Sequence, residues 1–152
     1  MCGGRWESRR WNVFVLRTFS ALIASALLVV ACTAETDDSE VAADLVEAWV
    51  AGWNADDPGE VAAVFTEDGV LLDPLNQVIE GRDAIESYVE RHDNITEEVC
   101  DLTGLTETTA GVFTTPCTFR SSGDARAGDL EITLEGDLAS QIQWLNLRFV
   151  TT

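Results

Sequence analysis

The sequence predicts an α+β domain in which three helices precede a long antiparallel β-sheet. Two features lead to this fold class. Apolar residues recur at helical spacing in the first half of the domain, and the second half is a succession of strand-like runs separated by short polar turns. Helices followed by consecutive strands are typical of an α+β fold. The 152 residues suffice for one such domain, which we place at residues 39–150, and a leader.

The leader, residues 1–31, has the composition of a secretory signal peptide. Four arginines precede or flank an uncharged apolar run, Thr18–Ala31, that is too short to span a bilayer as a helix. The run leads into Val-Val-Ala-Cys at residues 29–32, the lipobox pattern of bacterial lipoproteins. We therefore expect export, cleavage before Cys32, and anchoring to the outer face of a bacterial membrane by lipid on Cys32. The alternative is a buried cysteine at the end of a core helix. Residues 32–38 would form a polar tether.

Three helices are predicted in the first half of the domain. The first spans about residues 39–53, where apolar side chains share one helical face. The second begins at the capping sequence Asp57-Pro58-Gly59-Glu60 and continues to about Phe65. Two brief strands and the third helix follow, at residues 70–73, 78–80 and 82–92.

The second half is predicted to be a meander of four strands, at about residues 97–106, 111–120, 128–134 and 139–149. Cys100 and Cys117 lie on the first two of these strands. If Thr106 pairs with Gly111 across the turn, the same register sets Cys100 opposite Cys117, where a disulfide can form. An extracytoplasmic compartment would permit that bond. The alternative is a pair of small buried thiols.

The charge of the domain excludes several functions. Residues 32–152 carry five arginines and 26 acidic side chains, a net charge of −21. Such a surface repels phosphate backbones, so nucleic acid is not expected as a partner, and its ordinary role is to keep the surface solvated. His92 is the only histidine and is typical of a helix C-terminus. One histidine without clustered free thiols cannot build a zinc site, so neither a metal nor a cofactor is expected.

The segment FTEDGVLLDPLNQVIEGRDAIESYVE, residues 65–90, resembles a known family. It has a Phe before an Asp-Gly turn, a strand that closes on Asp73-Pro74, and Gly-Arg-Asp-Ala-Ile at the start of a helix. These features resemble SnoaL-like domains of the nuclear transport factor 2-like superfamily, and the order of elements extends the resemblance over residues 39–150. The resemblance implies a curved sheet wrapped around three helices, forming a cone with an apolar pocket. Many such domains dimerise through the outer face of the sheet.

Five aromatic side chains are candidates for lining that pocket: Trp49, Trp53, Phe65, Tyr88 and Trp144. Packing in the core is the alternative for each of them. Together they suit a flat apolar ligand, because binding pockets are mostly apolar with a few placed polar groups.

Asp73 is the candidate catalytic residue. Its position before Pro74 resembles that of the general base in the ketosteroid isomerases of the superfamily. The alternative is a turn-forming Asp that bonds to local backbone. Trp49 stands where those enzymes carry an oxyanion-hole Tyr, and Leu130 stands near their second donor. Losing one such donor costs about 100- to 1,000-fold in rate.

The superfamily includes isomerases, cyclases, dehydratases and noncatalytic binding domains, so the fold does not decide the function. Three hypotheses follow. The first is a membrane-anchored domain that binds a small hydrophobic molecule without catalysis. The second is a small isomerase, cyclase or dehydratase that uses Asp73 as acid and base. The third is a dimerisation or docking module of the cell envelope. The first two require Trp49 and Asp73 to face one cavity.

Overall fold

The computed structural model describes residues 37–92, 95–121 and 123–150. The leader and the candidate lipidation site Cys32 lie outside these ranges, and so does most of the expected tether. None of the helices within the ranges is long and apolar enough to cross a membrane.

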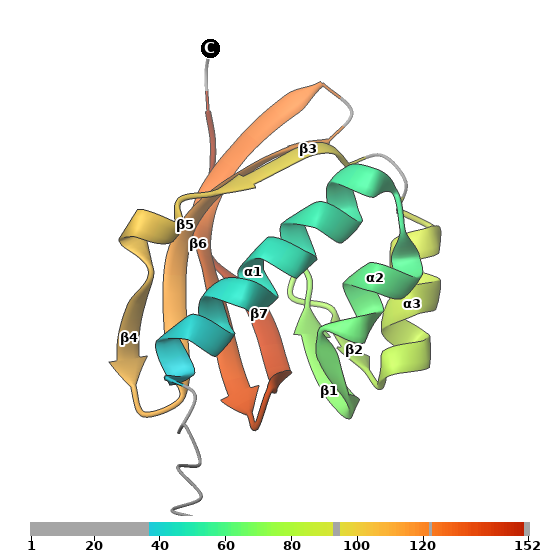
Figure 1. The fold of residues 1–152 in the computed structure, drawn as a ribbon. Coiled ribbons are helices and arrows are strands. Elements are labelled where there is room, and N and C mark those ends of the chain that lie inside the picture. The colour runs from blue at the N-terminus through green and yellow to red at the C-terminus, as the bar shows by residue number, and fades with distance from the viewer. Residues whose placement is uncertain (1–36, 93–94, 122, 151–152) are drawn as a thin grey trace, which may run out of the picture. The chain divides into compact units, whose positions relative to one another are not determined.

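The described residues form one seven-stranded sheet with helices on one of its faces (Figure 1). The helices are α1 (Asp38–Ala55), α2 (Pro58–Ala63), α3 (Arg82–Glu90) and a short 3₁₀ turn, η1 (Leu102–Gly104). The strands are β1 (Phe65–Leu72), β2 (Val78–Glu80), β3 (Ile95–Cys100), β4 (Thr106–Thr109), β5 (Val112–Ser121), β6 (Asp124–Glu135) and β7 (Leu138–Phe149). The predicted α+β class is confirmed.

The strands follow the order β2-β1-β7-β6-β5-β3 across the sheet, and β4 also pairs with β5. All pairs are antiparallel except one, since β1 and β7 run parallel, with Leu71 beside Ile142. The antiparallel sheet predicted from the sequence is therefore a mixed sheet. A parallel pair needs a long crossover connection, and the whole chain from β2 to β6 supplies it.

Local sequence accounts for the helix starts. The side chain of Asp37 accepts a hydrogen bond from the Ser39 N–H at the start of α1. The side chain of Asp57 accepts from the Glu60 N–H at the start of α2, with Pro58 in the first helical position, as the capping sequence predicts. Helices α1 and α2 lie so close that a Cβ on Gly52 would be 2.8 Å from the Val61 Cγ2.

Phe65 marks one boundary that the sequence analysis placed wrongly. The predicted second helix continues to Phe65, whereas α2 ends at Ala63 and Phe65 is the first residue of β1. Pairing with Ala139 on β7 draws Phe65 into the sheet, where its side chain is fully buried. Tertiary pairing outweighs the helical preference of this short segment.

The first predicted strand of the meander is in fact two strands. β3 and β4 are separated by η1, and both pair with β5. Cys100 lies opposite Cys117 and the two form a disulfide, with Cα atoms 4.1 Å apart, so this prediction is confirmed. The pairing of Thr106 with Gly111 is wrong, because Thr106 lies opposite Thr114. The break at η1 shifts the register of β4 without disturbing that of β3.

The long hairpin of β6 and β7 forms the middle of the sheet. Glu135 pairs with Leu138, which leaves Gly136 and Asp137 as a two-residue turn. Gly136 has a φ of 63°, a conformation that glycine adopts without strain. Helix α1 lies across the sheet and contacts β3, while α2 and α3 lie near β1 and β2 (Figure 1). The hydrophobic core lies between these helices and the sheet.

Candidate functional site

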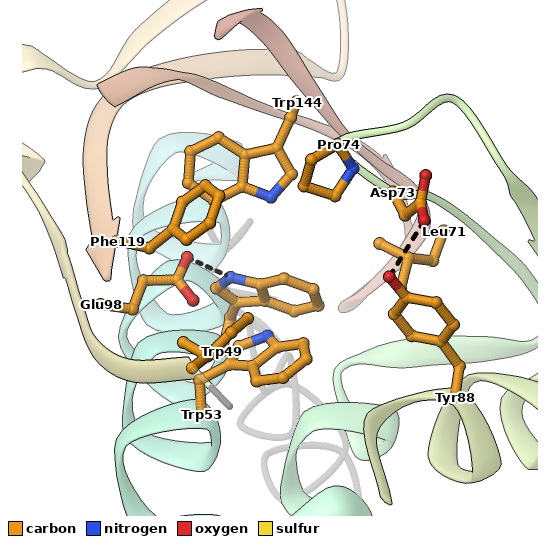
Figure 2. A pocket seen from close by; sticks show the side chains of 10 residues that line it. Trp49, Trp53, Leu71, Asp73, Pro74, Tyr88, Glu98, Phe119 and Trp144 are labelled. Atoms are coloured by element: carbon orange, nitrogen blue, oxygen red, sulfur yellow. Dashed lines mark hydrogen bonds between the residues drawn. The ribbon is translucent and has the colours of Figure 1, made fainter. Parts of the chain in front are cut away.

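A pocket opens between α1, α3 and the helix-covered face of the sheet (Figure 2). Its walls are mainly aromatic and aliphatic, and two carboxyl groups lie among them. The lining side chains are Trp49, Trp53, Leu71, Asp73, Pro74, Tyr88, Ile95, Glu98, Phe119 and Trp144. Trp49 and Asp73 therefore face one cavity, as the binding and catalytic hypotheses require.

The pocket is narrow. The hollow between the lining side chains has a volume of about 320 Å³, including its open mouth. The cavity inside it has a volume of about 30 Å³. A cavity of that volume holds one or two water molecules. A ligand the size of a steroid would need side chains to move, and Trp144, which is only half-buried, is the largest that can do so.

Helix α1 supplies the aromatic floor. Trp49 and Trp53 are four residues apart, so they lie on the same face of the helix. Their rings meet edge to face, with centroids 5.7 Å apart and an interplanar angle of 70°. Both side chains are more than nine-tenths buried. The Trp53 Nε1 atom is buried without a hydrogen-bond partner among the described residues, which is an unusual state for an indole N–H.

The opposite wall comes from the sheet. Phe119 on β5 and Trp144 on β7 are in contact, with ring centroids 4.9 Å apart and an interplanar angle of 58°. The nitrogen edge of the Trp144 indole is directed toward the space above Trp49 (Figure 2). Trp49, Trp53 and Trp144 thus all line this pocket, and they are all the tryptophans between residues 37 and 150.

Phe65 is a candidate that the structure removes from the pocket. Its ring packs behind Trp49, with centroids 6.0 Å apart, and it does not line the cavity. Its carbonyl oxygen accepts hydrogen bonds from the Arg82 guanidinium, from Nε at 3.1 Å and from Nη2. The role of Phe65 is therefore core packing, one of the two alternatives that its sequence leaves open.

Asp73 lies at the end of β1, and three donors hold its carboxylate. Oδ1 accepts from the backbone N–H groups of Leu75 at 2.8 Å and Gln77 at 2.7 Å, while Oδ2 accepts from the Tyr88 hydroxyl at 3.1 Å. The first two bonds are those of a turn-forming Asp. A carboxylate has about four acceptor sites, so few remain for a proton from a ligand.

Tyr88 joins α3 to the Asp73 turn and lines the pocket between them. Burial, followed by the nearby Asp73 carboxylate and the hydrogen bond to it, raises the pKa of Tyr88 well above its ordinary value. The hydroxyl therefore stays protonated and serves as a donor. His92 stacks on the Tyr88 ring at 4.0 Å, and its Nδ1 lies 2.7 Å from the Tyr88 carbonyl oxygen. His92 supports the ring and does not line the pocket.

Glu98 is the residue that the sequence analysis missed. Its side chain is 1% exposed, and its Oε1 accepts a 2.7 Å hydrogen bond from the Trp49 Nε1 (Figure 2). Burial raises the pKa of Glu98 from 4.5 to about 8, and the Trp49 hydrogen bond opposes this rise. The carboxyl group is therefore mostly protonated at neutral pH. Adjacent Glu97 and Glu98 look like solvated charges in the sequence, yet alternation from Cys100 puts Glu98 on the inner face.

Asn54 fixes the strand that carries Glu98. Its Nδ2 donates to the Glu98 carbonyl at 2.7 Å, and its Oδ1 accepts from the Glu98 N–H at 2.8 Å. One amide side chain at the end of α1 thereby replaces the two ladder bonds that an edge residue lacks. The described residues contain no group of three or more side chains suited to hold a metal ion.

The chain was compared with known proteins. Residues 46–137 match the family model of the SnoaL-like domain. No curated protein is similar to the chain in sequence. Solved structures are similar in fold at low identity. A protein from Catenulispora acidiphila DSM 44928 with a ketosteroid isomerase-like fold, in complex with trimethylamine, has a TM-score of 0.58 at 20% identity and covers 66% of this chain and 83% of its own.

Two further structures share the fold. A nuclear transport factor 2-like protein from Cytophaga hutchinsonii ATCC 33406 has a TM-score of 0.57 at 15% identity, covering 70% of this chain and 88% of its own. A computationally designed 17-OHP binder has a TM-score of 0.59 at 12% identity, covering 74% and 98%. At these identities the likeness concerns the fold alone. The family match spans most of the domain, and the chain belongs to the SnoaL-like domain family of the nuclear transport factor 2-like fold.

Proposed function

We propose that the domain binds a small, mainly apolar molecule in the pocket between Trp49 and Asp73, without catalysis. The observation that carries this proposal is the pattern of polar groups in an aromatic pocket. Two carboxyl groups there are each held by an aromatic donor, and the buried Trp53 N–H is left unpartnered. Pockets that bind small molecules combine apolar walls with a few fixed polar groups in this way.

The contacts of Asp73 favour binding over catalysis. A general base must be free to accept a proton from its substrate. Asp73 instead accepts three hydrogen bonds from Leu75, Gln77 and Tyr88, and two of them maintain the turn that follows β1. Leu130, near the expected second donor of an oxyanion hole, is a fully buried apolar residue. Leu130 therefore cannot supply the second donor of the resembled enzymes' oxyanion hole.

Nuclear magnetic resonance of the indole N–H groups tests the binding proposal directly. Trp49, Trp53 and Trp144 all line the pocket, so their three signals report on it. Trp6 and Trp11 are internal controls where the leader is retained. We expect titration with small probes (cyclohexanone, 3,3-dimethylbutan-1-ol and choline) to shift the pocket signals with at least one of them.

A matched pair of variants on β3 locates the binding. Ile95→Phe adds a ring inside the pocket, whereas Val99→Phe adds the same ring at an exposed position of the same strand. The shifts should be lost in the first variant and kept in the second. Pocket signals that none of the three probes moves in the wild-type chain would refute the proposal.

Acid–base chemistry at Glu98 is the second candidate function. A carboxyl group with a pKa near the working pH can give and take a proton, and Glu98 lines the pocket with its pKa raised to about 8. Deuterium exchange at the α-carbons of cyclohexanone in D₂O measures this activity. Catalysed exchange in the wild type, with loss in Glu98→Gln, would favour the enzyme over the binding domain.

We also propose that Cys32 carries the lipid that anchors the domain outside the cell. The support is the leader itself: clustered arginines, a short apolar run, and the lipobox before Cys32. The disulfide between Cys100 and Cys117 fits an oxidising compartment. A tether of a few polar residues would then hold the pocket near the membrane surface.

A further inference from the structure

The pocket contains acids but no base. Asp73 and Glu98 both line it, and no Arg, Lys or His of the described chain does. Buried charges in proteins are normally paired, because an isolated charge loses its hydration without compensation. The two acids differ in the number of hydrogen-bond donors that compensate their charge. Asp73 is compensated by three donors, two of them in its own turn.

Glu98 is compensated only in part. Its Oε1 accepts from Trp49, and no other described residue donates to its carboxyl oxygens. The carboxyl group nevertheless faces the cavity. Burial favours the neutral acid and raises the pKa of Glu98 to about 8. A cation bound beside the carboxyl group would favour its ionised form.

The groups around Glu98 do not supply that charge. Asp73 and Tyr88 face it across the pocket, and the exposed Glu47 of α1 lines a neighbouring hollow with it. On β5, its partner is Phe119. These groups are acidic or neutral, so none of them places a positive charge beside the carboxyl group. The next residue of β5, Arg120, is exposed and does not line the pocket.

The walls around Glu98 suit an organic cation better than a metal ion. Trp49, Trp53 and Trp144 enclose the space next to the carboxyl group, and aromatic faces attract ammonium groups, tryptophan most strongly. A hard metal ion would need six or more oxygen ligands, which these side chains do not offer. The cavity is narrow, so a small cation requires less side-chain movement than a larger ligand, and the half-buried Trp144 would move aside to admit it.

We propose that the ligand is a small methylated ammonium ion. Its charge pairs with Glu98 and its methyl groups contact Trp49 and Trp144. This inference rests on the proposed binding function. Trp53 lines the pocket and its buried N–H has no partner in the described protein, so an oxygen on a short arm of such a ligand would be its acceptor. The net charge of −21 over residues 32–152 attracts cations to the domain.

Choline and 3,3-dimethylbutan-1-ol form a matched pair of probes for this proposal. The two molecules have the same shape and hydroxyl arm, and they differ in a quaternary nitrogen against a quaternary carbon. We would titrate the full chain with each at constant ionic strength and follow the indole N–H signals. Choline should bind at least about tenfold more tightly at pH 9, from cation–π attraction and the Glu98 charge together.

The pH dependence gives a readout that needs no variant. Choline requires the ionised form of Glu98, which is about 1% of the empty protein at pH 6 if the pKa is about 8. The choline affinity should therefore fall up to about 100-fold from pH 9 to pH 6, whereas that of the neutral alcohol should change little. In Glu98→Gln, which can still accept from Trp49, both the preference for choline and its pH dependence should disappear.

Trp144→Leu is a second variant, which leaves the buried carboxyl group in place and replaces a side chain that is only half-buried. It should weaken choline more than the alcohol. Equal or tighter binding of the alcohol would overturn the cation proposal and leave the binding function intact. A choline affinity that rises toward pH 6 would also overturn the cation proposal, because the protonated form of Glu98 would then be the one that binds. If neither probe nor cyclohexanone moves the indole signals, the binding function fails as well.

Discussion

The Trp49 indole donates a 2.7 Å hydrogen bond to the carboxyl group of Glu98, which lies 49 residues further along the chain. Each of the two side chains is 1% exposed. The bond links the first helix to β3, a strand at the end of the sheet order. It thus belongs both to the packing of the domain and to the wall of the pocket.

Glu98 should make the stability of the domain fall as the pH rises. Burial raises its pKa from 4.5 in the unfolded chain to about 8 in the folded protein. Between these values the folded protein holds a proton that the unfolded chain has lost. The contribution of Glu98 to the free energy of unfolding is therefore fully present below pH 4.5 and declines up to pH 8, by at most about 1.4 kcal/mol per pH unit.

Urea unfolding of the wild type and Glu98→Gln across pH 5 to 9 isolates this contribution, since all other groups are shared. The free energy of unfolding of the variant should increase relative to that of the wild type as the pH rises to about 8. Above that pH the difference should stay constant. Glu47→Gln, the same substitution at an exposed position of α1, is the matched control. A difference between wild type and Glu98→Gln that does not vary with pH would contradict a neutral buried acid.

Asn54→Ala should destabilise the domain by about 1–2 kcal/mol. The substitution removes two hydrogen bonds, to the carbonyl and the N–H of Glu98, and leaves both backbone groups of a buried residue without a partner. Thermal unfolding would measure the loss. Asp44→Ala, an exposed substitution in the same helix, is the matched control and should change little. Equal stabilities of the two variants would mean that water replaces the Asn54 amide.

Reduction of the Cys100–Cys117 disulfide should lower the free energy of unfolding by about 3 kcal/mol, the value expected for a closed loop of this size. Urea unfolding with and without a reductant measures the loss. The double variant Cys100→Ser, Cys117→Ser should be insensitive to the reductant. Two thiols that react with an alkylating agent in the native, exported protein would show that the bond does not form there.

Cys32→Ser should abolish membrane association if Cys32 carries the lipid. Without the thiol the diacylglyceryl group cannot be attached, and the chain should remain uncleaved or enter the aqueous phase in detergent partitioning. Cys2→Ser, within the leader, is the control and should behave as the wild type. Wild type and Cys32→Ser that partition equally into the aqueous phase would refute the anchor.

Local rules predicted the parts of the fold that local sequence specifies. The cap at Asp57 and the adjacent Pro58 determine the start of α2, and both act within one helical turn. The pairing of Cys100 with Cys117 was correct although the turn from which it was argued was wrong. Phe65 could not be placed from the sequence, because its strand partner Ala139 lies far along the chain.

The pocket, too, contains residues that local sequence predicts and one that it does not. Its aromatic walls were predictable, since Trp49 and Trp53 share a helical face and Trp144 lies on a predicted strand. Glu98 was missed, because its residue type is the same as that of Glu97. The alternation from Cys100 separates the two only once β3 is paired with β5, which sets Glu98 opposite the buried Phe119. Whether an ionisable residue is buried in the core depends on strand pairing across the whole fold, which local sequence patterns do not predict.

The position of Glu98 on a terminal strand couples the chemistry of the cysteines to the choice of ligand. β3 pairs along its length with β5 alone, and the disulfide at Cys100 is two residues from Glu98. If reduction lets this strand detach, water reaches the carboxyl group, and its pKa returns toward 4.5. An ionised Glu98 in contact with water is already hydrated, so a bound cation stabilises it less than in the closed pocket. Oxidation of the two thiols would then be the step that gives the pocket its selectivity, and a domain made in a reducing compartment would acquire that selectivity only on leaving it.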